Sequence, residues 1–170
     1  MIDEREQEYR VGIGTDVHRL VEGRKLMLGG VHIQYPLGLA GHSDGDVVLH
    51  AVIDALLGAC GLGDIGALFP DTDEQWKDVD SKELLFAVRD KLEQKSWQVA
   101  NVDVTIHAEQ PRLESHKGQI RRCIAGLLAI DFAAVNVKAK TNEGLGEIGA
   151  GEAIAATAVA LLKKKQRRGL

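Results

Sequence analysis

Residues 39–73 read LAGHSDGDVVLHAVIDALLGACGLGDIGALFPDTD, and this stretch predicts one buried helix between two polar loops. Apolar residues dominate from Val47 to Leu57, as they do in a helix that packs against a sheet. Ser43 and Asp46 form an S-x-x-D pattern, which is typical of a helix N-terminus. We therefore expect a helix over about residues 44–59 and a long loop, rich in glycine, proline and aspartate, up to Asp80.

The chain before this helix predicts strands. Residues 11–18 (VGIGTDVH) alternate, so that Val11, Ile13, Thr15 and Val17 face one way and Gly12, Gly14, Asp16 and His18 face the other. Residues 25–34 (KLMLGGVHIQ) indicate two short strands joined at a Gly-Gly turn, which is a plausible hairpin.

The chain after the loop mixes helices and strands. Apolar residues at helical spacing follow a capping pattern at Asp80, and the same spacing recurs over 120–128. Residues 101–107 and 135–139 alternate between apolar and polar side chains, as strands do. The Ala-rich stretch 149–165 is expected to be a closing helix. There is no strict strand–helix alternation, so the fold class predicted is α+β (an α/β sandwich). It has a small mixed sheet of four to five strands with helices on one face.

The composition predicts one soluble domain in a reducing compartment. The 170 residues carry a formal net charge of -4, are 45% hydrophobic and are 27% charged, which excludes a disordered chain and a global basic field for nucleic acid. We expect a single domain over 9–165, a solvated extension over 1–8 and a C-terminal tail over 166–170. Cys60 and Cys123 lie in apolar helical runs, where free thiols are typical. No apolar run reaches the roughly 20 residues of a membrane span, and a cytoplasmic location is expected.

Asp16, His18 and His50 form the sharpest candidate site. Residues two apart on a strand project from the same face, so Asp16 and His18 can converge with a histidine from the facing helix. Two imidazole nitrogens and one carboxylate oxygen suit zinc and leave a fourth position open. Alternatively, His18 is a surface residue and His50 hydrogen-bonds Asp46 or Asp54 on its own helix.

Three further segments are candidates for phosphate or substrate binding. The 42–46 segment begins a helix and can hold phosphate oxygens, although capping alone also explains it. In the 138–146 segment, Lys140 and Thr141 can hold phosphate and Glu143 a hard divalent cation, although glycine-rich turns of this kind are common. The 63–73 loop is a candidate substrate flap, with solvated turns as the alternative.

Four segments occur in an order that resembles the 2-C-methyl-D-erythritol 2,4-cyclodiphosphate synthase family. They are IGTDVHRL (13–20), the 39–73 stretch quoted above, NVDVTIHAEQPRL (101–113) and NVKAKTNEGLG (136–146), and the resemblance spans about residues 10–163. It implies a homotrimer with active sites between neighbouring subunits. It also implies conversion of 4-diphosphocytidyl-2-C-methyl-D-erythritol 2-phosphate to the 2,4-cyclodiphosphate with release of CMP, in the non-mevalonate isoprenoid pathway.

The resemblance assigns roles by position. It implies that Asp16, His18 and His50 hold zinc, that Glu143 helps to hold magnesium or manganese, and that His42 and Thr141 are catalytic. Asp64 and Gly66 would bind the methylerythritol part under a flap over 69–73. The substrate-binding residues that it implies are Asp16, His18, His42, Ser43, Asp64, Ile65, Gly66, Phe69, Pro70, Asp71, Thr72, Asp73, Ala108, Arg112, Leu113, Ala139, Lys140, Thr141, Asn142 and Glu143.

The resemblance implies that residues 108–113 and the 139–141 turn form a cytidine pocket contributed by the adjacent subunit. Phosphoryl transfer needs mainly positioning and charge neutralisation, which agrees with a metal-dependent lyase that has no nucleophilic side chain. Two other functions stay open from the sequence. One is a zinc phosphohydrolase on the same scaffold, and the other is an inactive trimer that binds nucleotides or isoprenoid diphosphates.

Overall fold

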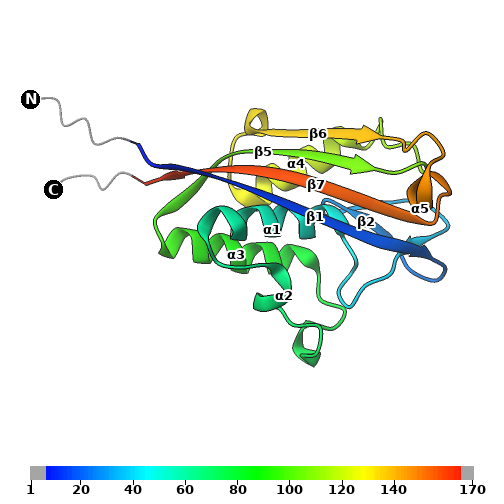
Figure 1. Ribbon diagram of the computed structural model, residues 1–170, viewed down its shortest axis with the longest axis horizontal. Helices are drawn as coiled ribbons and strands as arrows, with labels where there is room; N and C mark the ends of the chain where they lie inside the picture. The colour runs from blue at the N-terminus through cyan, green and yellow to red at the C-terminus, as the bar shows by residue number, and fades with distance from the viewer. Residues whose placement is uncertain (1–6, 166–170) are drawn as a thin grey trace, which may run out of the picture.

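The computed structural model describes residues 7–165, and its central feature is a five-stranded mixed sheet (Figure 1). The strand order is β4 (Gly38–Leu39), β1 (Tyr9–Val21), β7 (Ala153–Lys164), β5 (Trp97–His107) and β6 (Val135–Lys140). Among the strands of the described residues, only the β5–β6 pair of this sheet is parallel. Residues 1–6 of the expected extension and the expected tail lie outside the described residues.

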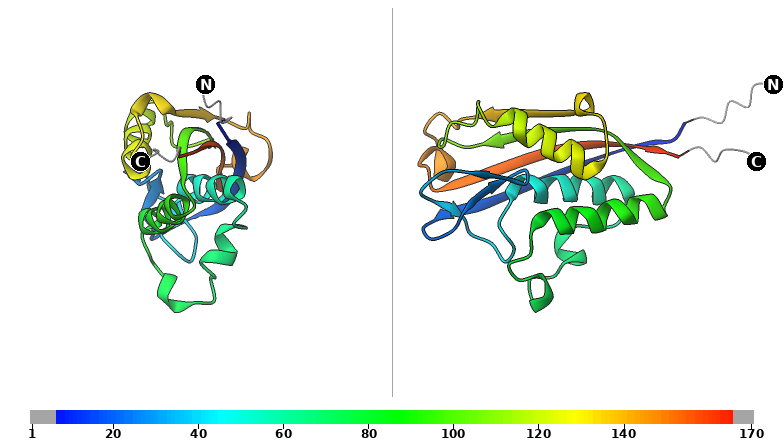
Figure 2. Two further views of the ribbon diagram at one scale, coloured as in Figure 1. Left: turned by 90° about the vertical axis from the view of Figure 1, so that its left-hand side faces the viewer. Right: turned by 180° about the vertical axis from the view of Figure 1, so that it is seen from behind.

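Helices cover one face of this sheet, as the sequence predicts. The three long helices are α1 (Val47–Cys60), α3 (Ser81–Gln94) and α4 (Lys117–Leu128). Seen from behind, they lie in front of the strands (Figure 2). The short helices are α2 (Ile65–Leu68), α5 (Gly146–Gly149), η1 (Glu74–Trp76) and η2 (Phe132–Ala134). None of the described helices has the length and apolar character needed to cross a membrane.

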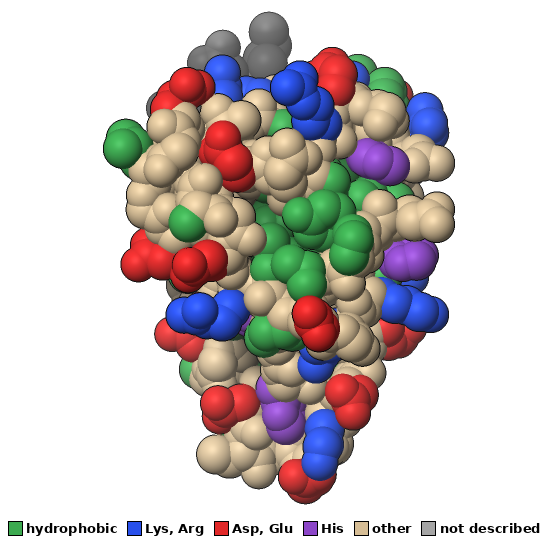
Figure 3. Space-filling view, turned by 90° about the vertical axis from the view of Figure 1, so that its right-hand side faces the viewer, with side chains coloured by type: hydrophobic (Ala, Val, Ile, Leu, Met, Phe, Trp, Pro, Cys, Tyr) green, Lys and Arg blue, Asp and Glu red, His purple; other side chains and the backbone are tan. Residues whose placement is uncertain are grey.

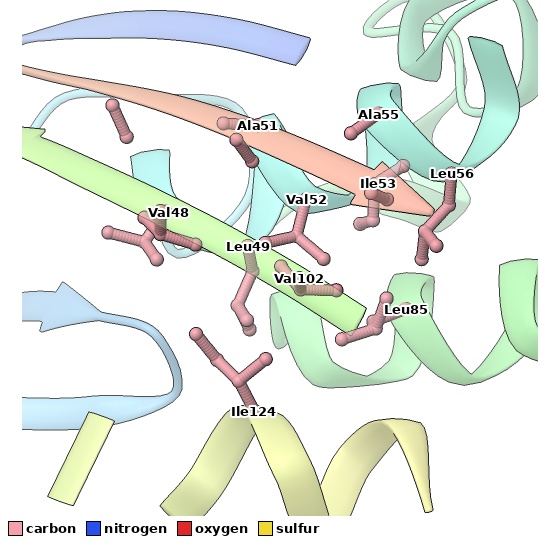
Figure 4. Close-up of a cluster of buried hydrophobic side chains, with 14 of the residues drawn as sticks. Val48, Leu49, Ala51, Val52, Ile53, Ala55, Leu56, Leu85, Val102 and Ile124 are labelled. Carbon is pink, nitrogen blue, oxygen red and sulfur yellow. The ribbon is translucent and has the colours of Figure 1, made fainter. Parts of the chain in front are cut away.

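The core lies between α1 and the helix-covered face of the sheet. Val48, Leu49, Val52 and Leu56 of α1 are fully buried, and the side chains of Val102, Leu85 and Ile124 converge on them from β5, α3 and α4 (Figure 4). Aliphatic side chains therefore fill the core, as a chain with only 4% aromatic residues requires. Cys60 is buried and Cys123 half-buried, and both are free thiols as predicted.

The predicted closing helix over 149–165 is wrong, because most of this stretch forms strand β7. β7 pairs with β1 along one edge and with β5 along the other, so it is the central strand of the sheet. Alanine favours a helix in isolation, but pairing with two neighbours overrides that propensity. Ala156, Ala158 and Ala160 point toward the core, where small side chains let α1 pack closely.

The predicted hairpin over 25–34 is confirmed and also supports the start of α1. β2 (Leu26–Leu28) and β3 (Val31–Ile33) pair around Gly29 and Gly30, which both have positive φ. The buried carboxylate of Asp46 accepts hydrogen bonds from both glycine N–H groups and from Val48 and Leu49. Asp46, and not Ser43, is therefore the N-cap, and α1 begins at Val47 instead of residue 44.

The two faces of β1 have opposite surroundings. Gly12, Gly14, Asp16 and His18 face the helix layer, and a Cβ added at Gly12 would lie 2.0 Å from the carbonyl oxygen of Ala55 in α1. Val11, Ile13 and Val17 face the other way and are 68%, 66% and 60% exposed. The alternation is as predicted, but in the single chain the apolar set lies on the uncovered face of the sheet.

Candidate metal centre and active-site cavity

Asp16, His18 and His50 converge on one point between β1 and the first turn of α1. The Oδ2 atom of Asp16 lies 2.8 Å from Nε2 of His18 and 2.9 Å from Nδ1 of His50, and the two nitrogens are 3.2 Å apart. Ligand atoms bound about 2.0 Å from one tetrahedral zinc ion are separated by roughly 3.3 Å. Among residues 7–165, no other group of three His, Cys, Asp or Glu side chains is arranged in this way.

The electrostatics of the cluster favour a charged carboxylate. Burial opposes ionisation of Asp16, but hydrogen bonds from His18 and His50 outweigh burial and hold its pKa well below the ordinary value. Burial also opposes the charged form of His18, whereas the hydrogen bond to Asp16 and its negative charge raise the pKa of His18. A divalent cation that replaces the imidazole protons would meet the same negative charge.

The outer nitrogen of each imidazole is held by neighbouring groups. Nε2 of His50 lies 2.9 Å from the hydroxyl oxygen of Ser81 and 3.1 Å from that of Ser43. The imidazole of His18 hydrogen-bonds the backbone of Ala40. These contacts rule out the alternative in which the His50 ring bonds Asp46 or Asp54. They leave one nitrogen of each ring directed at Asp16, so the donor set fits a zinc ion with an open fourth position.

A cavity of about 410 Å³ opens beside the three side chains. Ten of the residues predicted from the sequence line it: Asp16, His18, His42, Ser43, His50, Ile65, Gly66, Phe69, Pro70 and Asp71. Trp76 and Leu84 also line it, and sequence reasoning did not identify them. Trp76 follows the FPDTD stretch by three residues, so an isolated aromatic side chain in a polar loop was the signal available.

Two buried polar atoms at this cavity have no partner among the described residues. They are Nε2 of His42 and Nε1 of Trp76. Buried nitrogens of this kind are costly unless a ligand or water bonds them. Both side chains are therefore well placed to meet a polar ligand, which agrees with the assignment of His42 as a site residue.

The loop over 63–76 forms the outer wall of the cavity and hangs below α1 in Figure 1. The ring of Phe69 meets the ring of Trp76 edge to face, with centroids 5.0 Å apart. Asp54 of α1 anchors the loop by accepting the N–H of Ile65 at 2.7 Å. Asp64, Thr72 and Asp73 do not line the cavity, and Asp64 and Asp73 cap α2 and η1.

The remaining predicted residues form a second group at the carboxyl ends of β5 and β6. The Ala108 N–H donates to the carbonyl of Lys140 at 2.9 Å, and the Thr141 hydroxyl donates to Glu143 at 3.0 Å. None of Ala108, Arg112, Leu113, Ala139, Lys140, Thr141, Asn142 or Glu143 lines the cavity of the same chain. From this end, histidine and charged side chains surround a central hydrophobic patch (Figure 3).

Comparison with known proteins points to one family. Residues 9–163 match the model of the YgbB family. The chain is 55% identical over 155 residues to the 2-C-methyl-D-erythritol 2,4-cyclodiphosphate synthase of Alkaliphilus oremlandii, covering 91% of this chain and 99% of that protein. The synthase of the same name from Treponema denticola is 51% identical over 153 residues, covering 90% and 95% of the two chains.

Solved structures give the same result. The bifunctional IspDF of Campylobacter jejuni superposes with a TM-score of 0.90 at 43% identity, covering 94% of this chain and 43% of that chain. IspF of Plasmodium falciparum, solved as a CDP complex, superposes with a TM-score of 0.82 at 35% identity, covering 95% and 99%.

Proposed function

The chain belongs to the YgbB family, whose matched members are 2-C-methyl-D-erythritol 2,4-cyclodiphosphate synthases, and on this premise we propose how its residues perform the reaction. The protein is a metal-dependent phosphorus–oxygen lyase of the non-mevalonate isoprenoid pathway. It converts 4-diphosphocytidyl-2-C-methyl-D-erythritol 2-phosphate to 2-C-methyl-D-erythritol 2,4-cyclodiphosphate and releases CMP. The convergence of Asp16, His18 and His50 at the wall of one cavity carries this conclusion.

Asp16, His18 and His50 hold zinc in this proposal. Glu143 holds magnesium or manganese, which takes one or two protein carboxylates and completes its shell with substrate phosphates and water. When bound, such cations neutralise charge on phosphate oxygens and polarise the phosphorus that is attacked. The negative charge of Asp16, which its two imidazole partners stabilise, is what recruits a cation to this end of a chain with net charge -4.

His42 and Thr141 orient the diphosphate and stabilise the transition state. The unpartnered nitrogen of His42 is at the cavity beside Ser43, within reach of a ligand oxygen. The Thr141 hydroxyl is 3.0 Å from Glu143 in the second group of site residues. The substrate's own 2-phosphate supplies the attacking oxygen, so no side-chain nucleophile is required and in-line positioning is the main task of the protein.

The methylerythritol part occupies the cavity near Asp64, Ile65 and Gly66, and residues 69–73 close over it. Phe69 and Pro70 supply apolar contact with the carbon skeleton, and Asp71 gives a polar contact near its hydroxyls. Asp64 and Asp73 do not line the cavity and hold the loop by capping α2 and η1. The cavity residues thus bind the part of the substrate that does not react, and the binding energy gained there helps to hold the reacting groups in place.

A second subunit completes the site in this proposal. Ala108, Arg112, Leu113 and the 139–141 turn bind the cytidine from the adjacent chain, and the assembly is a cytoplasmic homotrimer. Two observations support it. The second group of site residues, at the carboxyl ends of β5 and β6, does not share a cavity with Asp16, His18 and His50 within one chain. The uncovered face of β1 also exposes a row of apolar side chains that a partner would bury.

The decisive experiment measures CMP release from the cytidyl substrate by purified protein with zinc and magnesium. We expect CMP and a cyclic diphosphate, identified by phosphorus NMR, and at least about a 100-fold loss of rate in His50→Ala. Inorganic phosphate without cyclic product would indicate a phosphohydrolase instead. Binding without turnover, or full activity in His50→Ala, would overturn the mechanism.

A further inference from the structure

The side of His50 that faces away from Asp16 contacts a buried hydroxyl network. Nε2 of His50 lies 2.9 Å from Oγ of Ser81, and Ser81 is fully buried at the first position of α3. Oγ of Ser81 lies in turn 2.5 Å from Oδ1 of Asp44. The network links the helix α3 and the 42–46 loop to a side chain of the metal centre.

The Asp44 carboxylate at the end of this network determines the direction of each hydrogen bond in it. A carboxylate oxygen of Asp44 can only accept, so the Ser81 hydroxyl donates its proton to Asp44. The lone pairs of the Ser81 oxygen then face His50, and the N–H at Nε2 of His50 donates to them. A neutral imidazole carries one proton, so with Nε2 protonated Nδ1 offers its lone pair to a cation that replaces the proton shared with Asp16.

Asp44 is held firmly in this role. Its Oδ2 accepts the backbone N–H of Ser81 at 3.2 Å, and its own N–H donates to the carbonyl of Val79 at 3.1 Å. The guanidinium of Arg24 donates to the backbone carbonyls of Gly41 and Ser43 and so fixes the loop from the other side. The acceptor at the end of the network is therefore anchored independently of any ligand.

We infer that Ser81, backed by Asp44, is a positioning residue that fixes His50 with Nε2 protonated and Nδ1 available to the metal. Neither Ser81 nor Asp44 lines the cavity beside the metal centre. Outer partners of metal-ligating histidines orient the ring and raise metal affinity, and their loss costs about 10- to 100-fold in affinity. The inference rests on the proposed function only for the identity of the ion as zinc.

The test measures zinc affinity of the purified full-length protein by competition with a chelating dye. Ser81→Ala should weaken zinc binding about 10- to 100-fold, because Nε2 keeps only the Ser43 hydroxyl at 3.1 Å. Ser115→Ala, at an exposed serine outside the site, is the matched control and should bind zinc as wild type does. The absorption of the cobalt-substituted protein should change in Ser81→Ala and not in the control.

A double-mutant cycle distinguishes this network from two separate effects. Asp44→Asn should weaken zinc binding, and the Ser81→Ala/Asp44→Asn double variant should bind about as weakly as Ser81→Ala, because Asp44 acts through Ser81. Additive losses, or wild-type affinity in Ser81→Ala, would overturn the inference. If Ser81→Ala does not fold, the zinc affinity of Asp44→Asn alone tests the inference, and wild-type affinity in that variant refutes the inference. Because zinc binding is measured without substrate, a protein that lacks synthase activity does not affect this result.

Discussion

Gly14 of β1 lies directly against the backbone of Ala51 in α1. A Cβ added at Gly14 would be 2.1 Å from the carbonyl oxygen of Ala51 and 2.6 Å from the N atom of Ala55. Ala51 follows the candidate ligand His50, and Gly14 precedes the candidate ligand Asp16 by two residues. The absence of a side chain at position 14 therefore sets the distance between the strand and the helix that carry the candidate metal centre.

Gly14→Ala should separate β1 from α1 and weaken zinc binding. Overpacking of a close contact costs about 1–3 kcal/mol of stability, and a displacement of about 1 Å at a catalytic site can lower activity about 100-fold. Chemical denaturation measures the loss of stability, zinc competition the loss of binding, and CMP release the loss of activity. Gly126→Ala is the control, because a Cβ at this exposed helical glycine meets no atom within 4 Å. It should raise stability slightly. Equal behaviour of the two variants would contradict the proposed role of Gly14.

Removal of zinc should lower the thermal stability of the protein. A ligand that binds only the folded state stabilises it by about 4 kcal/mol when present at about 1,000 times its dissociation constant. Calorimetry with and without a chelator should therefore show a clear drop in melting temperature. Asp16→Asn, which removes the shared carboxylate of the cluster, should show little response to the chelator. A chelator response of wild-type size in this variant would place the metal elsewhere.

Asp46→Asn should destabilise the fold by about 1–3 kcal/mol. Both carboxylate oxygens accept backbone N–H groups, and an amide would turn its NH₂ group toward at least one of these donors. Denaturant titration measures the change. Asp80→Asn is the matched control, since Asp80 also caps a helix but is partly exposed, and asparagine caps as well as aspartate. Similar losses in the two variants would show that helix capping alone explains Asp46.

Ile13→Asp should produce monomers and abolish most of the activity. Ile13 is 66% exposed on the uncovered face of β1, and a charge there is tolerated by the single chain but not at an apolar subunit contact. Sedimentation velocity and CMP release test the assembly and the dependence of the site on it. Gln119→Asp, on the exposed side of α4, should remain trimeric and active. A trimeric Ile13→Asp protein would exclude this face as the contact.

The ionised carboxylate of Asp103 should stabilise the folded protein near neutral pH, and this stabilisation should disappear in acid. Burial opposes its ionisation, but hydrogen bonds from Lys138 and Asn136 outweigh burial and lower its pKa below the ordinary 3.8. A group with a depressed folded-state pKa stabilises the protein above its unfolded-state pKa, and this contribution is lost as pH falls through the folded-state pKa. Wild type should therefore exceed Asp103→Asn in free energy of unfolding at pH 6, and the difference should shrink below pH 4. Protein concentration is kept constant in these measurements. If the difference in free energy of unfolding does not vary with pH, the Asp103–Lys138 ion pair is refuted as its cause.

Local pattern was sufficient for most of the elements and for the ligands of the candidate metal centre. The alternation at 11–18 correctly placed Asp16 and His18 on one face of a strand, because side-chain direction in a strand depends only on parity. The apolar run after Asp46 correctly predicted α1 and so brought His50 to the same layer. The Gly-Gly turn likewise predicted the hairpin, since two positive φ values favour glycine.

Two features of the site depended on contacts that are distant in sequence. Ser81 is 31 residues from His50, and no local pattern marks it as the acceptor of the imidazole proton. Trp76 lines the cavity because the 63–76 loop folds back under α1, which its irregular sequence does not indicate.

The sequence by itself determined which residues could form the candidate metal centre and where the hairpin turn lies, because these depend on side-chain chemistry and local periodicity. Only the tertiary structure decided that Ala153–Lys164 is a strand. Alanine carries little preference of its own for a face, and pairing with β1 and β5 supplies the hydrogen bonds that override its helical propensity. Close packing at Gly14 and Ala51 then fixes how near the ligands lie, because that distance depends on the backbones of two elements in contact.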